Sequence, residues 1–252
     1  MTGNPTPTPA SDPTVAVFRP DDERIDEAAA LLERLGVDPL ADPMLAVDPT
    51  GATPREDADY TVLTSKTGVE LAAEAGWRPA PDGAVCAIGD ATADALETAG
   101  YAVDVLPDTY SSTGLVDRLA GEVEGARVEV ARSDHGSAVL LEGLEEAGAY
   151  VHETVLYRLT RPEGAGESAE RAAAGDLDAA LFTSSLTVEH FLAAAEERGV
   201  RQAAIAGLEE AVVAAIGRPT AETAEAEGIG VDLVPAEADF ETLARETVTA
   251  LE

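Results

Sequence analysis

The sequence contains a long internal repeat, and this feature constrains the fold more than any other. DADYTVLTSKTGVE, at residues 57–70, resembles DLDAALFTSSLTVE, at residues 176–189, with an offset of 119 positions. Further along, IGDATADALETAG at residues 88–100 resembles IGRPTAETAEAEG at residues 216–228, with an offset of 128 positions. The chain is therefore predicted to consist of two versions of one structural half.

Each half alternates short apolar runs with helical stretches. VAVF is followed by IDEAAALLERLG, and YTVLTS is followed by VELAAEAG. Such alternation predicts parallel sheets with helices on both faces, whose ligands bind at the carboxyl ends of the strands. Because 252 residues exceed the usual size of one hydrophobic core, we expect two α/β domains.

The composition is very acidic, with 16 basic and 49 acidic residues and a net charge of -33. Molar salt screens such self-repulsion, because it shortens the Debye length to about 3 Å, so the composition is typical of an extreme halophile. The charge disfavours nucleic acid and anionic membranes as partners. Without a signal peptide or a membrane-spanning run, the sequence predicts a cytoplasmic protein, and we expect a monomer.

Metal and nucleotide sites are not indicated. Cys86 is the single cysteine and lies in an apolar run, so we expect a small buried hydrophobe. His135, His152 and His190 lack metal-ligand spacing, and neither a dinucleotide-binding glycine motif nor a phosphate loop occurs. We therefore predict no metal and no cofactor.

Proline-punctuated apolar stretches separate the predicted domains. Residues 39–47 and 153–162 lack helical periodicity, and we predict that they pair as a two-stranded extended linker. Residues 1–13, rich in proline and small polar residues, are predicted to be a flexible tail. The remaining chain then divides into a discontinuous domain 1 and a continuous domain 2, at residues 14–38 with 163–252 and at residues 48–152.

Hydroxyl-bearing turns follow strands in both halves. Such turns offer a hydroxyl and unpaired backbone N–H groups, which suit an anion. Each could instead simply cap its helix, but recurrence in register favours binding. The set comprises Thr64, Ser65, Thr92, Thr183, Ser184 and Thr220.

Two further interpretations concern caps and cations. Proline is favoured at the first helical position, so Pro219 predicts that Arg218 caps its helix and, by register, that Asp90 caps the other. Arg19 and Arg132 end the first strand of each half, at an offset of 113 positions. They could clamp carboxylates bidentately or form surface ion pairs, and the sequence leaves both open.

Taken in order, these motifs resemble the uroporphyrinogen-III synthase family from about Thr14 to the end of the chain. The shared skeleton is an early strand with arginine, L-T-S, I-G-x-x-T-A, a linker tyrosine, F-T-S and a second I-G-x-x-T-A. The resemblance implies two flavodoxin-like parallel-sheet domains joined by a two-stranded linker, with the active site in the cleft between them.

The resemblance also implies a reaction. Hydroxymethylbilane would lose its terminal hydroxyl as water and close to uroporphyrinogen III with inversion of the last ring, without a cofactor, in a cyclising hydro-lyase of tetrapyrrole biosynthesis. Tyr157 matches the linker tyrosine and is the catalytic candidate, since a tyrosine hydroxyl is protonated at neutral pH and can donate, although it could be only an apolar strand residue. The implied substrate-binding residues are Thr64, Ser65, Thr92, Ser111, Ser112, Thr183, Ser184, Thr220 and Arg19.

Two other functions fit the same architecture. The first is a non-catalytic module that binds or senses a tetrapyrrole or a small anion. Tyr157 and both I-G-x-x-T-A turns argue against it. The second is an unrelated two-domain small-anion-binding protein, for which a secretion signal would be expected.

Overall fold

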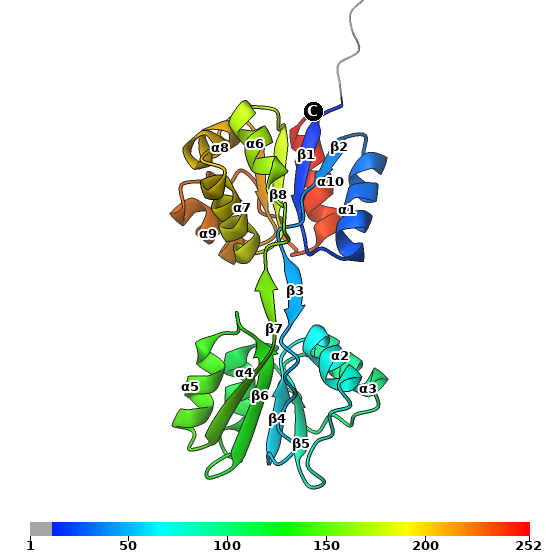
Figure 1. Cartoon of the computed structure of the whole chain (residues 1–252), viewed down its shortest axis with the longest axis vertical. Helices are drawn as coiled ribbons and strands as arrows, with labels where there is room; N and C mark the ends of the chain where they lie inside the picture. The colour runs from blue at the N-terminus through cyan, green and yellow to red at the C-terminus, as the bar shows by residue number, and fades with distance from the viewer. Residues whose placement is uncertain (1–11) are drawn as a thin grey trace, which may run out of the picture. The chain divides into compact units, whose positions relative to one another are not determined.

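The computed structural model describes residues 12–252, which divide into two compact units (Figure 1). Unit 1 comprises the described chain up to Ala46 together with Thr160–Glu252, and unit 2 comprises Val47–Leu159. The tail predicted over residues 1–13 lies almost wholly outside the described residues. Within residues 12–252 we find no helix with the length and apolar character needed to cross a membrane.

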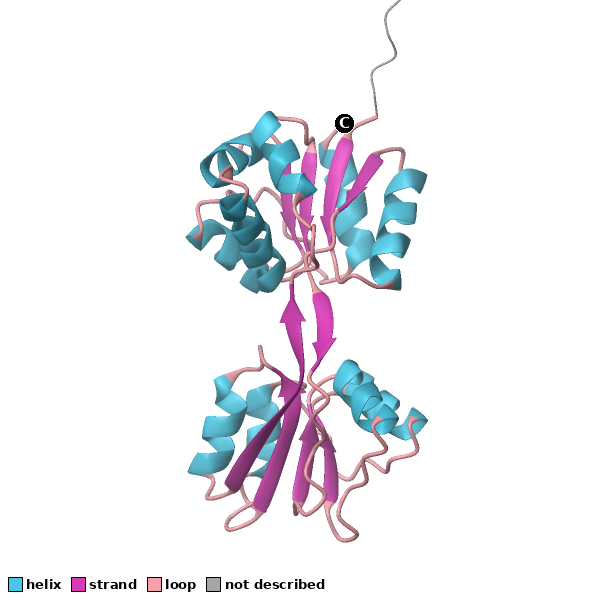
Figure 2. Ribbon diagram, viewed as in Figure 1, coloured by secondary structure: helices cyan, strands magenta, loops and turns pink. Residues whose placement is uncertain are grey.

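The sheet of unit 1 has four parallel strands in the order β2-β1-β8-β9. Helices α1 and α10 pack on one face, and α6, α7, α8 and α9 pack on the other (Figure 2). The strands are β1 (Thr14–Phe18), β2 (Asp38–Ala41), β8 (Ala179–Phe182) and β9 (Val212–Ala215). The helices are α1 (Glu23–Arg34), α6 (Glu167–Ala174), α7 (Ser185–Glu197), α8 (Arg201–Leu208), α9 (Arg218–Ala226) and α10 (Phe240–Ala250).

The second sheet has five strands in the order β3-β7-β6-β4-β5, which lie in unit 2 apart from the end residues Ala46 and Thr160. Helices α2 and α3 cover one face, and α4 and α5 cover the other. The strands are β3 (Ala46–Pro49), β4 (Tyr60–Leu63), β5 (Ala84–Ala87), β6 (Arg127–Ser133) and β7 (Tyr150–Thr160). The helices are α2 (Lys66–Glu74), α3 (Asp90–Thr98), α4 (Ser112–Leu119) and α5 (Ala138–Glu146).

These sheets confirm the predicted fold class of α/β units with parallel strands. The strands β1, β4, β5, β8 and β9 are mostly apolar because helices cover both faces of their sheets, whereas β6 also carries the buried Glu129 and Arg132. Cys86 in β5 is fully buried, as predicted, and this burial raises the pKa of its thiol to about 12.

The segment predicted as the first linker strand, residues 39–47, contains parts of two different strands. Pro39–Ala41 belong to β2 and pair with β1, with Pro39 opposite Val15, so the prediction began the linker too early. Proline lacks a donor N–H, but β2 is an edge strand, where this lack is tolerated. The end of the segment enters β3, which is hydrogen-bonded to β7, and the Thr50 N–H donates to the Leu156 carbonyl at 3.0 Å.

The sequence repeat extends to individual hydrogen bonds. The Asp104 carboxylate accepts the Val85 N–H at 2.9 Å, and at an offset of 128 Asp232 accepts the Val213 N–H at 2.8 Å. Asp59 and Asp178, 119 positions apart, likewise each accept a backbone N–H at the start of a neighbouring strand. Both copies therefore use carboxylates to hold strand ends in register.

A buried carboxylate fixes the start of α6 in unit 1. Asp42, which is 4% exposed, accepts the Gly166 N–H at 2.8 Å, the Ser168 N–H at 2.9 Å and the Ser168 hydroxyl. Gly166 has a φ of 113°, a conformation that favours glycine. Asp42 therefore satisfies N–H groups that the first helical turn leaves unpaired.

We expect Asp42→Ala to lower the free energy of unfolding by about 3 kcal/mol, because two buried N–H donors lose their acceptor. Chemical denaturation in molar KCl measures this change. Asp48→Ala is the control: Asp48 is exposed, and we expect a change within about 0.5 kcal/mol. Equal effects of the two substitutions would contradict the role given to Asp42.

Candidate active site

Parallel pairing brings the carboxyl ends of β4, β5 and β6 to one edge of the second sheet. Thr64 and Ser65 follow β4 at this edge. Ser65 caps α2, with extended backbone, and its Oγ accepts the Gly68 N–H at 3.0 Å. The first Thr-Ser turn thus lies where α/β proteins bind ligands.

Tyr157 meets this turn from β7. Its hydroxyl donates to Ser65 Oγ at 2.9 Å, and the side chain is 6% exposed. The pairing of β6 with β7 shifts between Arg132 and Ser133, so that Leu156 and Tyr157 both enter one core cluster. Neighbouring residues of a regular strand face opposite sides, and a bulge of this kind can redirect a side chain.

The helices after β5 and β9 begin one residue earlier than predicted. Gly89 caps α3 and Gly217 caps α9, so the assignment of the caps to Asp90 and Arg218 was wrong. Pro219 occupies the second helical position, where the backbone N–H also lacks a partner within the helix. Missing that N–H therefore costs the helix nothing there.

Thr92 and Thr220 occupy equivalent positions in these two helices. Each is 4% exposed, so their side chains offer little surface to a ligand. Asp90 and Ala91 at the start of α3, and Arg218 at the start of α9, are exposed, so their backbone N–H groups are the better candidates for donors at these turns.

A third turn in unit 2 leads into α4. Ser111 caps this helix and accepts the Gly114 N–H at 3.0 Å, while Ser112 is its first residue. The preceding Tyr110 donates to Asp90 at 2.6 Å, and this hydrogen bond raises the pKa of the phenol. This link between the α3 and α4 turns was not predicted from the sequence.

In unit 1 both hydroxyl groups of the second Thr-Ser turn form hydrogen bonds to nearby groups of the same unit. The Thr183 hydroxyl donates to the Phe18 carbonyl at 2.5 Å, which joins the ends of β8 and β1. Ser184 caps α7 in a reciprocal capping box with Thr187. Gly68 stands at the position of Thr187 in the first copy, which therefore has no such box.

The two arginines that end the first strands behave differently. Arg132 is buried and pairs with Glu153 at 2.6 Å, so it forms an ion pair, although not on the surface. Arg19 has no carboxylate partner within residues 12–252, and its guanidinium lies 4.6 Å from the centre of the Phe240 ring. Burial, and then the charge of Arg24, lower the pKa of Arg19. Arg19 thus remains available to an anion.

Comparison with known proteins identifies the family. The family described as "Uroporphyrinogen-III synthase HemD" matches residues 26–245. A protein of Methanothermobacter thermautotrophicus named "Putative uroporphyrinogen-III synthase" is 34% identical over 230 residues, covering 85% of this chain and 90% of that protein. The chain belongs to the uroporphyrinogen-III synthase family.

Solved structures agree with the fold of the uroporphyrinogen-III synthase family. The chain resembles a mutant uroporphyrinogen III synthase of Thermus thermophilus with a TM-score of 0.66 at 23% identity, covering 94% of this chain and 98% of that one. It resembles uroporphyrinogen-III synthetase of Helicobacter pylori with a TM-score of 0.59 at 16% identity, covering 95% and 100%. Membership of the family implies an enzyme of the lyase kind in tetrapyrrole biosynthesis.

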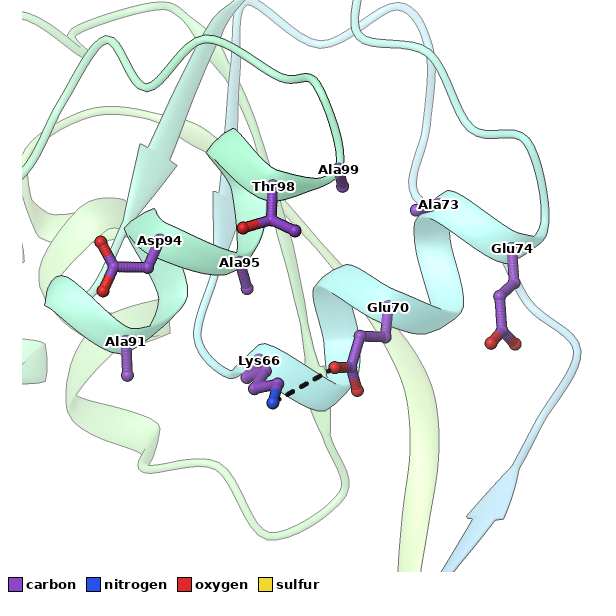
Figure 3. A pocket seen from close by; sticks show the side chains of 9 residues that line it. All are labelled: Lys66, Glu70, Ala73, Glu74, Ala91, Asp94, Ala95, Thr98 and Ala99. Carbon is purple, nitrogen blue, oxygen red and sulfur yellow. Dashed lines mark ion pairs between the residues drawn. The ribbon is translucent and has the colours of Figure 1, made fainter.

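One cavity lies close to the first Thr-Ser turn, but the charges of its lining residues disfavour an anionic ligand. It has a volume of about 610 Å³ and lies between α2 and α3, where Figure 3 shows Lys66 paired with Glu70. Glu70, Glu74 and Asp94 line it. Three carboxylates against one ammonium make this cavity unfavourable for a carboxylate-bearing substrate.

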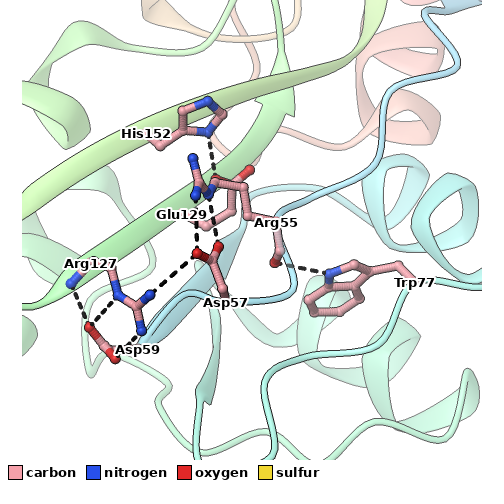
Figure 4. Close-up of polar contacts among 7 residues, drawn as sticks. All are labelled: Arg55, Asp57, Asp59, Trp77, Arg127, Glu129 and His152. Atoms are coloured by element: carbon pink, nitrogen blue, oxygen red, sulfur yellow. Dashed lines mark hydrogen bonds and ion pairs between the residues drawn. The ribbon is translucent and has the colours of Figure 1, made fainter.

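A charged cluster lies near the start of β6, at the end of the strand away from the candidate site (Figure 4). Glu129 is fully buried and lies 2.7 Å from His152 Nδ1. Arg127 forms ion pairs with Asp57 and Asp59. Apart from His152, which was considered above only as a metal ligand, these residues were not predicted to form a cluster. Within residues 12–252 we find no group of three or more His, Cys, Asp or Glu side chains that could hold a metal ion.

Gly68 is a residue of the candidate site that was not predicted from the sequence. The Cβ that alanine would add lies 3.1 Å from Ser65 Oγ, 3.3 Å from Leu156 Cδ1 and 4.0 Å from Tyr157 Cε1. The missing side chain therefore leaves room for the contact between Tyr157 and Ser65. The available signal was the Gly68–Thr187 difference between the two copies.

We expect Gly68→Ala to lower the free energy of unfolding by about 1 kcal/mol. Crowding costs roughly 1–3 kcal/mol and outweighs a helix-propensity gain of about 1 kcal/mol. Chemical denaturation measures the net effect. Gly121→Ala is the control, since nothing lies within 4 Å of its added Cβ. A Gly68→Ala protein that is more stable than wild type would contradict the crowding.

Proposed function

We propose that this protein is a uroporphyrinogen-III synthase that converts hydroxymethylbilane to uroporphyrinogen III with loss of water and inversion of the last ring. Its membership of the family supports the proposal. The observation that carries it is the buried Tyr157 hydroxyl at 2.9 Å from Ser65 Oγ, at the carboxyl edge of a parallel sheet. This contact joins the proposed catalytic residue to a proposed substrate-binding turn.

The proposed reaction requires a proton donor and groups that hold the flexible bilane substrate in one conformation. The leaving hydroxyl departs most easily as water, and Tyr157 is the proposed source of the proton. Direct end-to-end closure would give isomer I, so the main task is to hold the bilane in the folded pose that leads to inversion. Positioning of this kind needs few catalytic side chains.

The proposed carboxylate-binding groups are the hydroxyl-bearing turns and one arginine. In unit 2 they are Thr64, Ser65, Thr92, Ser111 and Ser112, and in unit 1 they are Arg19, Thr183, Ser184 and Thr220. Because Thr92 and Thr220 are 4% exposed, we assign binding there to backbone N–H groups more than to the hydroxyls.

The net charge of -33 opposes the approach of a polycarboxylate substrate. Molar salt limits the reach of surface charges to about 3 Å. Helix N-termini act at contact distance, each equivalent to about half a positive charge. The starts of α2, α3 and α4 in unit 2, and of α7 and α9 in unit 1, can therefore attract the substrate locally.

We expect the purified protein in molar KCl to convert hydroxymethylbilane mainly to uroporphyrinogen III. Chromatographic separation of the oxidised products distinguishes isomer III from isomer I. Hydroxymethylbilane without protein is the control, because closure without inversion gives isomer I. Binding of the bilane with isomer I as the only product would instead identify a non-catalytic binding module.

We expect Tyr157→Phe to lower kcat more than Thr92→Ala does. The first change removes a proton donor, worth about 10²-fold or more, whereas the second removes one buried hydroxyl beside a binding turn. Steady-state rates of isomer III formation measure both. Equal losses would remove the distinction between catalysis and binding.

A further inference from the structure

We propose that Ser65 donates the proton to the departing hydroxyl group of the substrate. Tyr157 does not donate to the substrate directly, but transfers its own proton to Ser65. This inference rests on the proposed function. It gives Ser65 a second role, because sequence analysis assigned it only to substrate binding.

Both lone pairs of Ser65 Oγ are occupied. The oxygen accepts the Gly68 N–H at 3.0 Å and the Tyr157 O–H at 2.9 Å. A serine hydroxyl has one proton and two lone pairs, so only its proton is free to form a further bond. Apart from Tyr157 Oη, which is the donor in this pair, no protein acceptor for that proton lies within hydrogen-bond distance among residues 12–252. Two incoming donors also polarise the hydroxyl and strengthen it as a donor.

Burial gives the order of the two hydroxyl groups. Tyr157 is 6% exposed and packs with Leu156 in the core, and its proton is directed at Ser65. Ser65 is only partly buried, at the start of α2. A substrate at this edge therefore meets the serine hydroxyl first, and Tyr157 reaches the substrate through it.

The proton transfer balances within one turnover. As the C–O bond of the hydroxymethyl group breaks, its electron pair goes to the oxygen, which takes the Ser65 proton and leaves as water. The Tyr157 proton moves to Ser65 Oγ and leaves a phenolate. Ring closure later releases one proton from the attacked pyrrole carbon, and this proton returns through Ser65 to Tyr157. The net change is loss of one water.

The second copy of the repeat lacks this arrangement. Ser184 accepts the Thr187 N–H at 3.2 Å, and no tyrosine donates to it among the residues described. Thr187 fills the place that Gly68 leaves open for Tyr157. The proton-transfer pair therefore belongs to unit 2 alone, and Ser184 remains a proposed binding residue.

Ser65→Asn separates proton transfer from positioning. Asparagine is as good a helix cap as serine, and its amide oxygen can accept from Gly68 and Tyr157. Its amide N–H can bind a carboxylate but does not transfer a proton. We expect kcat to fall by about 10²-fold or more, while KM changes by less than about threefold. Ser65→Thr, which keeps the hydroxyl, should retain most of the activity.

Two further variants complete the test. Ser65→Asn combined with Tyr157→Phe should be no slower than Ser65→Asn alone, because both residues act on one proton. Ser137→Ala is the control, since Ser137 caps α5 in the same unit and lies outside the proposed site. We expect its kcat to match that of wild type. Denaturation midpoints of all variants show whether the fold is retained.

Three outcomes would overturn the inference. The first is a Ser65→Asn enzyme that keeps wild-type kcat while Tyr157→Phe loses activity, since Tyr157 would then donate directly. The second is multiplicative losses in the double variant. The third is a Ser65→Thr enzyme as slow as Ser65→Asn. Failure of the proposed function is distinct, because the wild-type protein would then form no isomer III.

Discussion

Parallel strand pairing is the constraint on which the candidate site depends. β4 pairs in parallel with both β5 and β6, and β8 pairs in parallel with both β1 and β9. Each helix that follows a strand must therefore start at the same edge, with its unpaired N–H groups turned toward that edge. Asp59, Asp104, Asp178 and Asp232 hold the strand starts in register by accepting backbone N–H groups. The chemistry of the edge follows from this backbone arrangement.

Much of this arrangement was predictable from sequence because it follows from periodicity. The repeat and the alternation of strand and helix predicted two parallel-sheet halves, and the order of the motifs pointed to the family. The site was less predictable, because its geometry depends on local irregularities. The bulge that places Leu156 and Tyr157 in one core cluster has no signature in the residues of β7. The cap positions at Gly89 and Gly217 differed from prediction by one residue, since proline is tolerated at two adjacent helical positions.

The two copies differ in the side chains that meet the strand ends. Arg132 is neutralised by Glu153, whereas Arg19 has only the Phe240 ring beside it. At the Thr-Ser turns, one helix start uses a capping box through Thr187, and the other uses Gly68 and receives Tyr157 instead. The repeat therefore preserves the backbone turns in both units, and the proposed proton transfer rests on the differences, because only unit 2 has the Tyr157–Ser65 contact.

The discontinuity of unit 1 affects the order in which the protein can fold during synthesis. β1 ends at Phe18, but its partner β8 begins at Ala179, and the acceptor Asp42 meets Gly166 only 124 residues later. Unit 2 is complete before β8 leaves the ribosome. Because synthesis adds about 5–20 residues per second, the edge of β1 that pairs with β8 stays unpaired for roughly 10–30 s. Strong negative charge protects such a nascent chain from aggregation, because it repels neighbouring chains whose strands are also still unpaired.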